Sequence, residues 1–182
     1  MRVIAGAFKG RRLKAPAWDG LRPTADKLRE TLFNVLAPRL EGARVLDGYA
    51  GTGAVGVEAL SRGAADVVFV ERSRRAAALI ASNLAVCGVE RGYTIHCGDV
   101  ASVLRRMPEG AAFDLVFLDP PYEADAALVT EALEASAGRL APGGVLVLER
   151  ATRREPDIPG ALVRTRDLRS GDSTLTFMMG PR

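Results

Sequence analysis

Val45-Leu46-Asp47-Gly48-Tyr49-Ala50-Gly51-Thr52-Gly53-Ala54-Val55-Gly56 is the stretch that decides the fold of this chain. Its apolar residues run into an acid, a glycine-rich turn follows, and a helical pattern begins after the turn. That succession predicts a buried strand, a tight loop and a helix N-terminus, the first unit of a nucleotide-binding α/β domain. Glycines let the backbone turn sharply and let a ligand approach where a Cβ atom would clash. The N–H groups at the helix start favour an anionic group such as a carboxylate or a phosphate.

The glycine loop leaves two cofactors open, NAD and S-adenosylmethionine. Gly51, Gly53 and Gly56 have the spacing of the dinucleotide fingerprint, and an acid that could bind a ribose, Glu71, lies 20 residues past Gly51. Asp47 stands at the strand end before the glycines, where it could accept a hydrogen bond from the ammonium group of a methionine moiety. A carboxylate there would sit badly beside a pyrophosphate, so Asp47 favours S-adenosylmethionine.

Length and composition restrict the class of protein. A chain of 182 residues suits one domain with one sizeable core. Two cysteines, Cys87 and Cys97, are too few for a disulfide framework or a zinc site, and one histidine, His96, offers little to a Ser-His-Asp triad or a His-based metal site. Without an apolar run of membrane-spanning length or a signal-peptide pattern, we expect a reduced, cytoplasmic protein that uses neither metal nor membrane.

Basic residues concentrate near the N-terminal end. Residues 1–30 contain eight Lys and Arg against three Asp and Glu, whereas the whole chain has a net charge of only +3. Such an excess suggests contact with a polyanion such as RNA, and a solvated face is the alternative that charge alone leaves open. The candidates for RNA contacts lie in a predicted β-ribbon over residues 1–15 and are Lys9, Arg11, Arg12 and Lys14.

Strands and helices alternate from residue 43 onward, after a predicted helix over 24–38 that Thr24 would cap. The predicted strands are 43–46, 66–70, 93–97, 114–118 and 145–148, and the helices between them are 55–61, 74–86, 100–106 and 126–139. Two final runs, 161–165 and 174–179, are typical of an antiparallel pair. We therefore expect an α/β domain over 41–182, with a mostly parallel sheet and a C-terminal antiparallel strand pair, and a small ribbon-and-helix extension over 1–40.

Four consecutive predicted strands end at or within two residues of an acid, in turn Asp47, Glu71, Asp99 and Asp119. In such sheets ligands bind at the C-terminal ends of the strands, whereas helix capping would account for one or two acids. Four together predict a polar ligand laid across this edge. Glu71 could take the ribose hydroxyls, Asp99 could accept from an adenine amine, and Asp47 suits the amino-acid end.

Asp119-Pro120-Pro121-Tyr122 is the most specific signal in the chain. Its two prolines remove two backbone donors and leave carbonyls that only accept. Together with the Asp119 carboxylate, they could hold both protons of an exocyclic amine and direct its lone pair at an incoming methyl, while Tyr122 stacks on the base. This chemistry needs no metal and no covalent nucleophile. The loop contains no cysteine, which argues against a methylase that attacks a cytosine carbon.

With these motifs the chain resembles the RsmD family of bacterial small-subunit rRNA guanine-N2 methyltransferases over nearly its whole length. The more family-specific blocks are Met1-Arg2-Val3-Ile4-Ala5-Gly6, Lys9-Gly10-Arg11-Arg12-Leu13, Arg22-Pro23-Thr24 and Arg29-Glu30-Thr31-Leu32-Phe33-Asn34. The match continues through the glycine loop, Glu71 and the Asp-Pro-Pro-Tyr loop. Gly48-Tyr49 departs from the bulkier pair that such proteins more often have, and Gly171-Asp172-Ser173-Thr174 matches the usual tail only in part.

The resemblance implies a Rossmann-like S-adenosylmethionine-dependent methyltransferase fold. It also implies transfer of the methyl group to the N2 amine of guanine 966 in 16S rRNA, on an assembled or partly assembled 30S particle. It places Arg22–Thr24 and Asn34 near the methionine end of the cofactor. The expected catalytic residues are Asp119, Pro120, Pro121 and Tyr122. The expected cofactor contacts are Arg22, Thr24, Asn34, Asp47, Gly48, Tyr49, Gly51, Thr52, Gly53, Glu71, Arg72, Asp99, Val100 and Asp119.

Other activities are compatible with parts of this pattern. An amino methylase acting on DNA adenine or on a protein glutamine would use the same cofactor. A nicotinamide-dependent oxidoreductase would use the same glycine loop, but His96 is predicted to lie in a strand, so no catalytic acid or base is evident. A non-enzymatic RNA-binding assembly factor would have no need of an intact Asp119 and Glu71.

Overall fold

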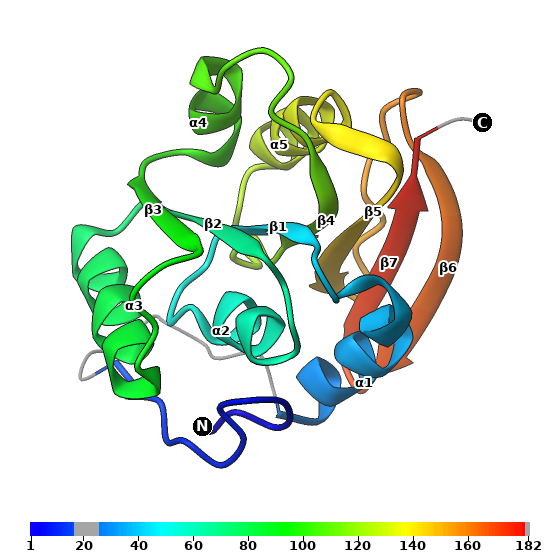
Figure 1. Cartoon of the computed structure of the whole chain (residues 1–182). Helices are drawn as coiled ribbons and strands as arrows, with labels where there is room; N and C mark the ends of the chain where they lie inside the picture. The colour runs from blue at the N-terminus through cyan, green and yellow to red at the C-terminus, as the bar shows by residue number, and fades with distance from the viewer. Residues whose placement is uncertain (17–25, 181–182) are drawn as a thin grey trace.

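A sheet of seven strands forms the centre of the molecule, which a computed structural model describes over residues 1–16 and 26–180 (Figure 1). The strands are β1 (Arg44–Gly48), β2 (Asp66–Glu71), β3 (Tyr93–Cys97), β4 (Phe113–Leu118), β5 (Leu140–Ala151), β6 (Val163–Ser170) and β7 (Ser173–Met179). The helices are α1 (Asp26–Leu36), the 3-10 helix η1 (Ala37–Arg39), α2 (Ala54–Ser61), α3 (Arg74–Cys87), α4 (Val100–Arg106) and α5 (Ala126–Ala137).

The strand order is β3-β2-β1-β4-β5-β7-β6. β1 to β5 pair in parallel through helical crossovers, and β7 runs antiparallel between β5 and β6. This arrangement confirms the predicted Rossmann-like fold, including the C-terminal antiparallel pair. The two final strands are joined by a short turn, so β7 folds back and pairs with both of its neighbours.

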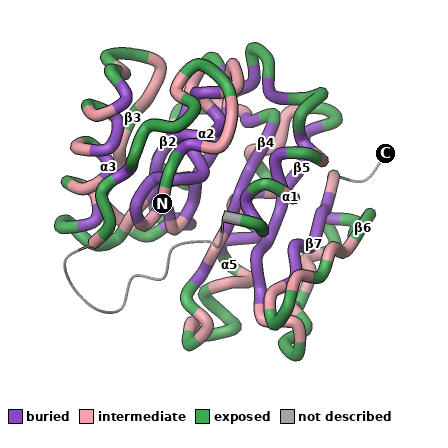
Figure 2. The backbone as a smooth tube through the Cα atoms, turned by 90° about the horizontal axis from the view of Figure 1, so that it is seen from below, coloured by how far each residue is buried: buried purple, intermediate pink, exposed green. Residues whose placement is uncertain are grey.

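Helices cover both faces of the sheet, with α1, α2 and α3 on one side and α4 and α5 on the other (Figure 1). The apolar strands therefore bury alternate residues in two cores. Phe117 belongs to the core under α1–α3, and its neighbour Leu118 belongs to the core under α4 and α5. Figure 2 shows the buried positions concentrated in the strands and on the inner sides of the helices. Within the described ranges no helix is long and apolar enough to span a membrane.

The helix ends have the chemistry that their sequences predict. The Ser73 hydroxyl accepts a hydrogen bond from the Ala76 N–H at the start of α3, and Gly88 ends that helix with a φ of 72°. Asp99 and Asp125 cap α4 and α5 in the same way, each accepting from a backbone N–H of the first turn. These caps fix where each helix begins relative to the strand before it.

Residues 1–16, called the N-terminal arm below, differ from the predicted β-ribbon. They form a hairpin-like loop with a single antiparallel bridge, between Arg2 and Arg12. The arm lies against α2 (Figure 1), and its apolar residues Val3 and Leu13 are buried in the core under α1–α3. A regular ribbon does not form because the N–H groups of residues 4, 5, 7 and 8 bond to α2 and not across the arm.

Two strands near the C-terminus are longer than predicted. β5 covers Leu140–Ala151 and β6 covers Val163–Ser170, against predictions of 145–148 and 161–165. The extension of β5 contains Glu149 and Arg150, which are buried although they are charged. The apolar pattern stops before these residues, but the pairing of β5 with β7 continues to Ala151.

Candidate active site

The two loops that carry the predicted chemistry lie side by side. β1 and β4 are neighbours in the sheet, and Gly48 at the end of β1 pairs with Leu118 at the end of β4. The Asp119 N–H donates to the Gly48 carbonyl oxygen over 3.4 Å. The glycine loop and the Asp-Pro-Pro-Tyr loop therefore leave the sheet at the same edge, as predicted. The strand order also puts the four predicted acids in one row along this edge, in the order Asp99, Glu71, Asp47 and Asp119.

The glycines of the loop have different tasks. Gly51 and Gly53 have φ values of 55° and 75°, in the left-handed region that favours glycine, and make the turn. Gly56 lies in α2, where an added Cβ would be 2.2 Å from the Phe69 ring, so its missing side chain lets α2 pack closely on β2. At Gly48 a Cβ would lie 2.5 Å from a methyl carbon of Leu118, which explains why a small residue stands there.

Glu71 faces the glycine loop. One carboxylate oxygen accepts from the Gly51 N–H over 2.9 Å, and the other accepts from the Ser73 N–H over 2.7 Å. Each carboxylate oxygen has a further lone pair, so Glu71 retains acceptor capacity for a ribose hydroxyl. The half-buried position next to the turn agrees with the predicted role, which stays a prediction.

Asp47 lies deeper than its predicted role suggests. The residue is 1% exposed, and its Oδ2 accepts from the Gly56 N–H over 2.8 Å. Burial raises the pKa of Asp47 to about 8, the Gly56 hydrogen bond opposes this rise, and the charge of Glu71 adds to it. In this structure Asp47 joins β1 to the first turn of α2. Contact with a methionine ammonium group stays a prediction.

The residues expected at the adenine end gather around the start of α4. Asp99 is exposed and accepts from the Ser102 N–H over 2.9 Å, so one of its oxygens serves as the helix cap. Val100 is buried in the core under α4 and α5, which leaves its main chain as the part available to a ligand. Tyr49, whose φ is 60°, lies near the charges of Asp99 and Arg72. The pKa of Tyr49 is raised to about 12, mainly because the side chain is buried. The charge of Asp99 also raises this pKa, and the charge of Arg72 opposes the rise.

The Asp-Pro-Pro-Tyr loop is held by its own carbonyls. The Pro121 carbonyl accepts from the Ala124 N–H over 2.8 Å, and the Tyr122 carbonyl accepts from the guanidinium of Arg154. Sequence reasoning assigned the carbonyls of this loop to the substrate, but these two bind the protein itself. Asp119 is half-buried at the end of β4. The Tyr122 hydroxyl shares a hydrogen bond of 2.7 Å with the Ser173 hydroxyl at the start of β7.

A buried amide joins the N-terminal arm to the glycine loop. Asn83 of α3 is fully buried, and its Oδ1 accepts from the Lys14 N–H over 2.7 Å. Its Nδ2 donates to the Thr52 carbonyl over 2.9 Å and to the Lys14 carbonyl over 3.3 Å. Sequence reasoning missed Asn83, although a polar residue among the buried positions of α3 (Ala76, Ile80, Leu84 and Cys87) was a signal that could have found it.

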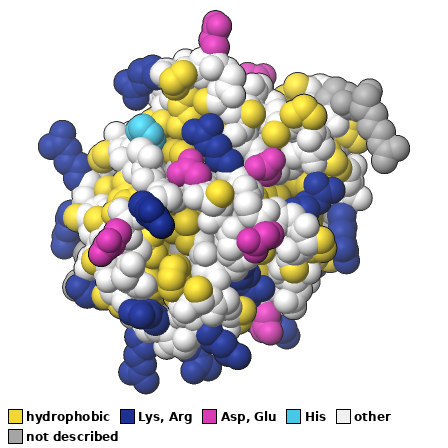
Figure 3. Space-filling model, in the orientation of Figure 1, with side chains coloured by type: hydrophobic (Ala, Val, Ile, Leu, Met, Phe, Trp, Pro, Cys, Tyr) yellow, Lys and Arg dark blue, Asp and Glu magenta, His cyan; other side chains and the backbone are white. Residues whose placement is uncertain are grey.

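The four basic residues predicted to contact RNA divide into two pairs. Arg11 donates to the Val86 carbonyl over 2.8 Å, and the Lys14 ammonium donates to the Ser82 hydroxyl over 2.6 Å, so both are tied to α3. Lys9 and Arg12 are exposed on the arm. Figure 3 shows Lys and Arg side chains over this part of the molecule, at the bottom of the view. Among the other predicted contacts, Asn34 is exposed on α1, and Arg22 and Thr24 lie outside the described residues.

Comparison with known proteins places this chain in a family. The family model described as Conserved hypothetical protein 95 matches residues 1–179. The putative rRNA methyltransferase YlbH of Bacillus subtilis (strain 168) is 38% identical over 168 residues, 91% of each chain. The ribosomal RNA small subunit methyltransferase D of Haemophilus influenzae is 37% identical over 151 residues, 82% of this chain and 78% of that protein. The solved structure of the putative methyltransferase yhhF from Escherichia coli superposes with a TM-score of 0.86 at 30% identity, covering 99% of this chain and 97% of that one. This chain belongs to the Conserved hypothetical protein 95 family, which is the RsmD family that its sequence resembles.

Proposed function

We propose that this chain transfers a methyl group from S-adenosylmethionine to the N2 amine of a guanine in 16S rRNA, the guanine called 966 in its family, on the 30S particle. The observation that carries the proposal is the adjacency of the two loops at the ends of β1 and β4, joined by the hydrogen bond from Asp119 to Gly48. An amine held at Asp119 would face whatever the glycine loop binds. The names of the Bacillus and Haemophilus relatives support rRNA as the substrate class.

The residues at the sheet edge fit S-adenosylmethionine. Its ribose hydroxyls and adenine amine are donors, and the edge offers carboxylate acceptors at Glu71 and Asp99. The glycine loop, with positive φ values at Gly51 and Gly53, would take the methionine end, and the main chain of Val100 would border the adenine. When bound, this cofactor supplies a methyl group on a positively charged sulfur.

The chain's own residues would then orient the amine. The Asp119 carboxylate accepts one amine proton and a loop carbonyl accepts the other, so that the nitrogen lone pair points toward the glycine loop. The half-buried ring of Tyr122 stacks on the base and holds its plane. As the new N–C bond formed and the bond between the methyl group and the sulfur broke, the sulfur would become neutral and the nitrogen positively charged. The nitrogen would then lose a proton, for which the Asp119 carboxylate would be the acceptor.

A methyl-transfer assay on 30S particles that lack this modification tests the proposal, with mass spectrometry locating the product. We expect methylation of guanine N2, and we expect Asp119→Ala to lower kcat by about 10² or more while changing the affinity for S-adenosylmethionine much less. Transfer to DNA adenine or to protein glutamine, with none to rRNA, would replace the proposal with the other amino methylase. Calorimetric binding of NADH in place of S-adenosylmethionine would favour an oxidoreductase.

A further inference from the structure

The Asp-Pro-Pro-Tyr loop is held at two points by the C-terminal part of the chain. The guanidinium of Arg154 donates to the Tyr122 carbonyl and, over 3.3 Å, to the Ala124 carbonyl. The Ser173 hydroxyl bonds the Tyr122 hydroxyl over 2.7 Å. One contact fixes the backbone of Tyr122 and the other fixes the far end of its ring. Because a tyrosine side chain has two rotatable bonds, holding both ends leaves its ring little freedom.

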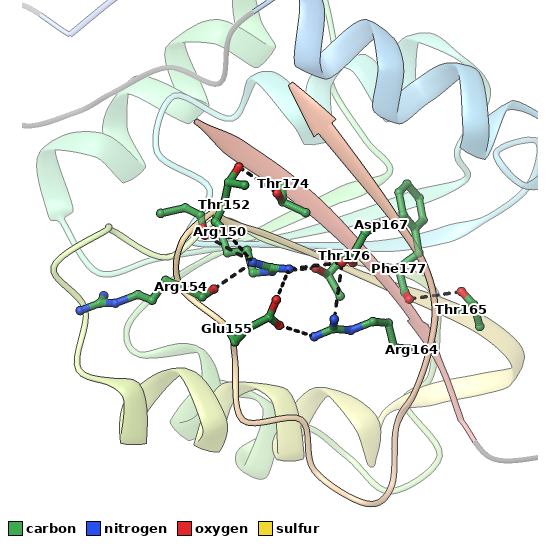
Figure 4. A network of polar contacts seen from close by, with 11 residues as sticks. Arg150, Thr152, Arg154, Glu155, Arg164, Thr165, Asp167, Thr174, Thr176 and Phe177 are labelled. Atoms are coloured by element: carbon green, nitrogen blue, oxygen red, sulfur yellow. Dashed lines mark hydrogen bonds and ion pairs between the residues drawn. The ribbon is translucent and has the colours of Figure 1, made fainter. Parts of the chain in front are cut away.

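The main chain of Arg154 is held by a network of charged residues around the buried Arg150 (Figure 4). Its carbonyl oxygen accepts from the Arg150 guanidinium over 3.0 Å, and the Arg150 side chain is 5% exposed. Arg150 also bonds the Thr176 hydroxyl over 2.9 Å, Glu155 over 3.2 Å and Asp167 over 3.3 Å. The buried guanidinium of Arg150 thus bonds to partners on β7, on β6 and in the segment after β5, and it holds the backbone of Arg154 in place. The side chain of Arg154 extends away from this network (Figure 4).

We propose that Arg154 and Ser173 are positioning residues that set the plane of the Tyr122 ring, and with it the stacking surface for the target base. The inference rests on the proposed function and deepens it, because it assigns the shape of the base pocket to the β6–β7 hairpin and the segment before it. A ring held at both ends is oriented before the base arrives, so less freedom is lost on binding.

A purely structural role predicts a different result. Loss of folding stability would lower the affinity for S-adenosylmethionine and the turnover together. Loss of ring orientation would lower kcat on the RNA substrate and leave the dissociation constant of the cofactor unchanged, because the glycine loop lies on β1 and keeps its own contacts to Glu71 and Asn83.

The test is a double-mutant cycle on Tyr122 and Ser173, measured as kcat and KM on 30S particles beside calorimetry with S-adenosylmethionine. We expect Ser173→Ala and Tyr122→Phe each to lower kcat about fivefold to tenfold, and the double variant to lose no more than either single variant. Ser173→Thr, which keeps the hydroxyl, should retain most of the activity. Full kcat in Ser173→Ala, or losses that multiply in the double variant, would overturn the assignment.

Arg154 has a matched control in its exposed neighbour Arg153. Arg154→Ala should lower kcat about tenfold to a hundredfold and speed amide exchange in residues 119–125, whereas Arg153→Ala should change neither. Methylation by the wild type tests the proposed function by itself, and the exchange measurement needs no substrate. Unchanged exchange in Arg154→Ala would overturn the inference even where the wild type methylates guanine N2.

Discussion

Gly6→Ala should release the N-terminal arm from α2. The Cβ that it introduces would lie 1.7 Å from the carbonyl oxygen of Ser61, the last residue of α2, so the backbone must shift to relieve the clash. That oxygen accepts from the Ala7 N–H over 2.7 Å, and the Ser61 hydroxyl accepts from the Phe8 N–H over 2.9 Å. The substitution therefore places a methyl group between the arm and the residue on which it docks.

Gly10→Ala is the matched control. Gly10 has a φ of 84° against 83° for Gly6, so an alanine at either position is forced into a left-handed φ, which costs about 1–2 kcal/mol. A Cβ at Gly10 would have nothing within 4 Å, so this variant leaves the docking contacts in place. The difference in free energy of unfolding between the two variants therefore measures how much the docking of the arm stabilises the protein.

The structure gives the size of that difference. Release of the arm breaks three hydrogen bonds with Ser61, those from the Ala7 and Phe8 N–H groups and one from the Ser61 hydroxyl to the Ala5 carbonyl over 2.5 Å. It also breaks the bonds from the Ile4 and Ala5 N–H groups to Glu58, at 2.8 and 3.0 Å. Glu58 is fully buried, so its carboxylate would lose two partners. Each lost neutral hydrogen bond costs about 1 kcal/mol, and each bond to a charged group costs more. The conformational freedom that the released arm regains offsets part of this loss. We therefore expect Gly6→Ala to be about 3–5 kcal/mol less stable than Gly10→Ala.

Urea unfolding of both variants, with fluorescence and circular dichroism compared to check two-state behaviour, gives the two free energies of unfolding. Limited proteolysis reports on the arm directly, and we expect rapid cleavage within residues 1–16 in Gly6→Ala alone. Equal losses of stability in the two variants, with equal protection of the arm, would show that the contact with Ser61 does not hold the arm on α2.

The remaining predictions concern cofactor binding, pH dependence and RNA binding. Glu71→Ala should weaken S-adenosylmethionine binding about tenfold or more, since charge-assisted hydrogen bonds contribute about 1.5–3 kcal/mol, and an unchanged calorimetric dissociation constant would remove Glu71 from the site. Folding raises the pKa of Asp47 from 3.8 to about 8, so between these pH values the folded state holds a proton that the unfolded state has released. The free energy of unfolding should therefore fall by up to about 1.4 kcal/mol per pH unit as the pH rises through this range. Asp47→Asn should lack this pH dependence. If the free energy of unfolding changed equally between pH 5.5 and 7.5 in the wild type and in Asp47→Asn, the pKa of Asp47 would not be raised. Replacing Lys9 and Arg12 together by alanine should flatten the slope of log affinity for 30S against log salt by up to about two units, and an identical slope would mean that the two residues form a solvated face.

The mostly parallel sheet with its C-terminal antiparallel pair could be predicted, and so could the meeting of the two loops at one sheet edge, because both follow from local patterns. Apolar runs that end in acids specify buried parallel strands, and the rule that ligands bind at strand C-termini then brings Glu71 and Asp119 to one edge. The glycine spacing specified the turn at Gly51 and Gly53 in the same way. These features depend on neighbours within about twenty residues.

The polar contacts that join distant segments could not be predicted. Asn83, Glu58 and Arg150 are all buried, and each bonds to partners that periodicity does not identify. A helical or strand pattern says which face is buried, but it does not say which segment covers that face. Ser173 lies in a stretch that only partly matches the family, so neither pattern nor resemblance connected it with Tyr122.

The docking of the N-terminal arm sets an order on how the chain can fold as it is synthesised. The arm is made before its partners Glu58 and Asn83, which lie 54 and 69 residues further along the chain, counted from Ile4 and Lys14. At roughly 5–20 residues per second, the first sixteen residues wait on the order of several seconds before α3 is complete. Val3 and Leu13 have no core to enter during that time, so closure of the arm is a late step, taken after β1, α2 and β2 have been made. A chain that stops short of residue 83 would therefore contain the α2 partners of the arm but lack the Asn83 hydrogen bonds to Lys14 of the arm and to Thr52 of the glycine loop.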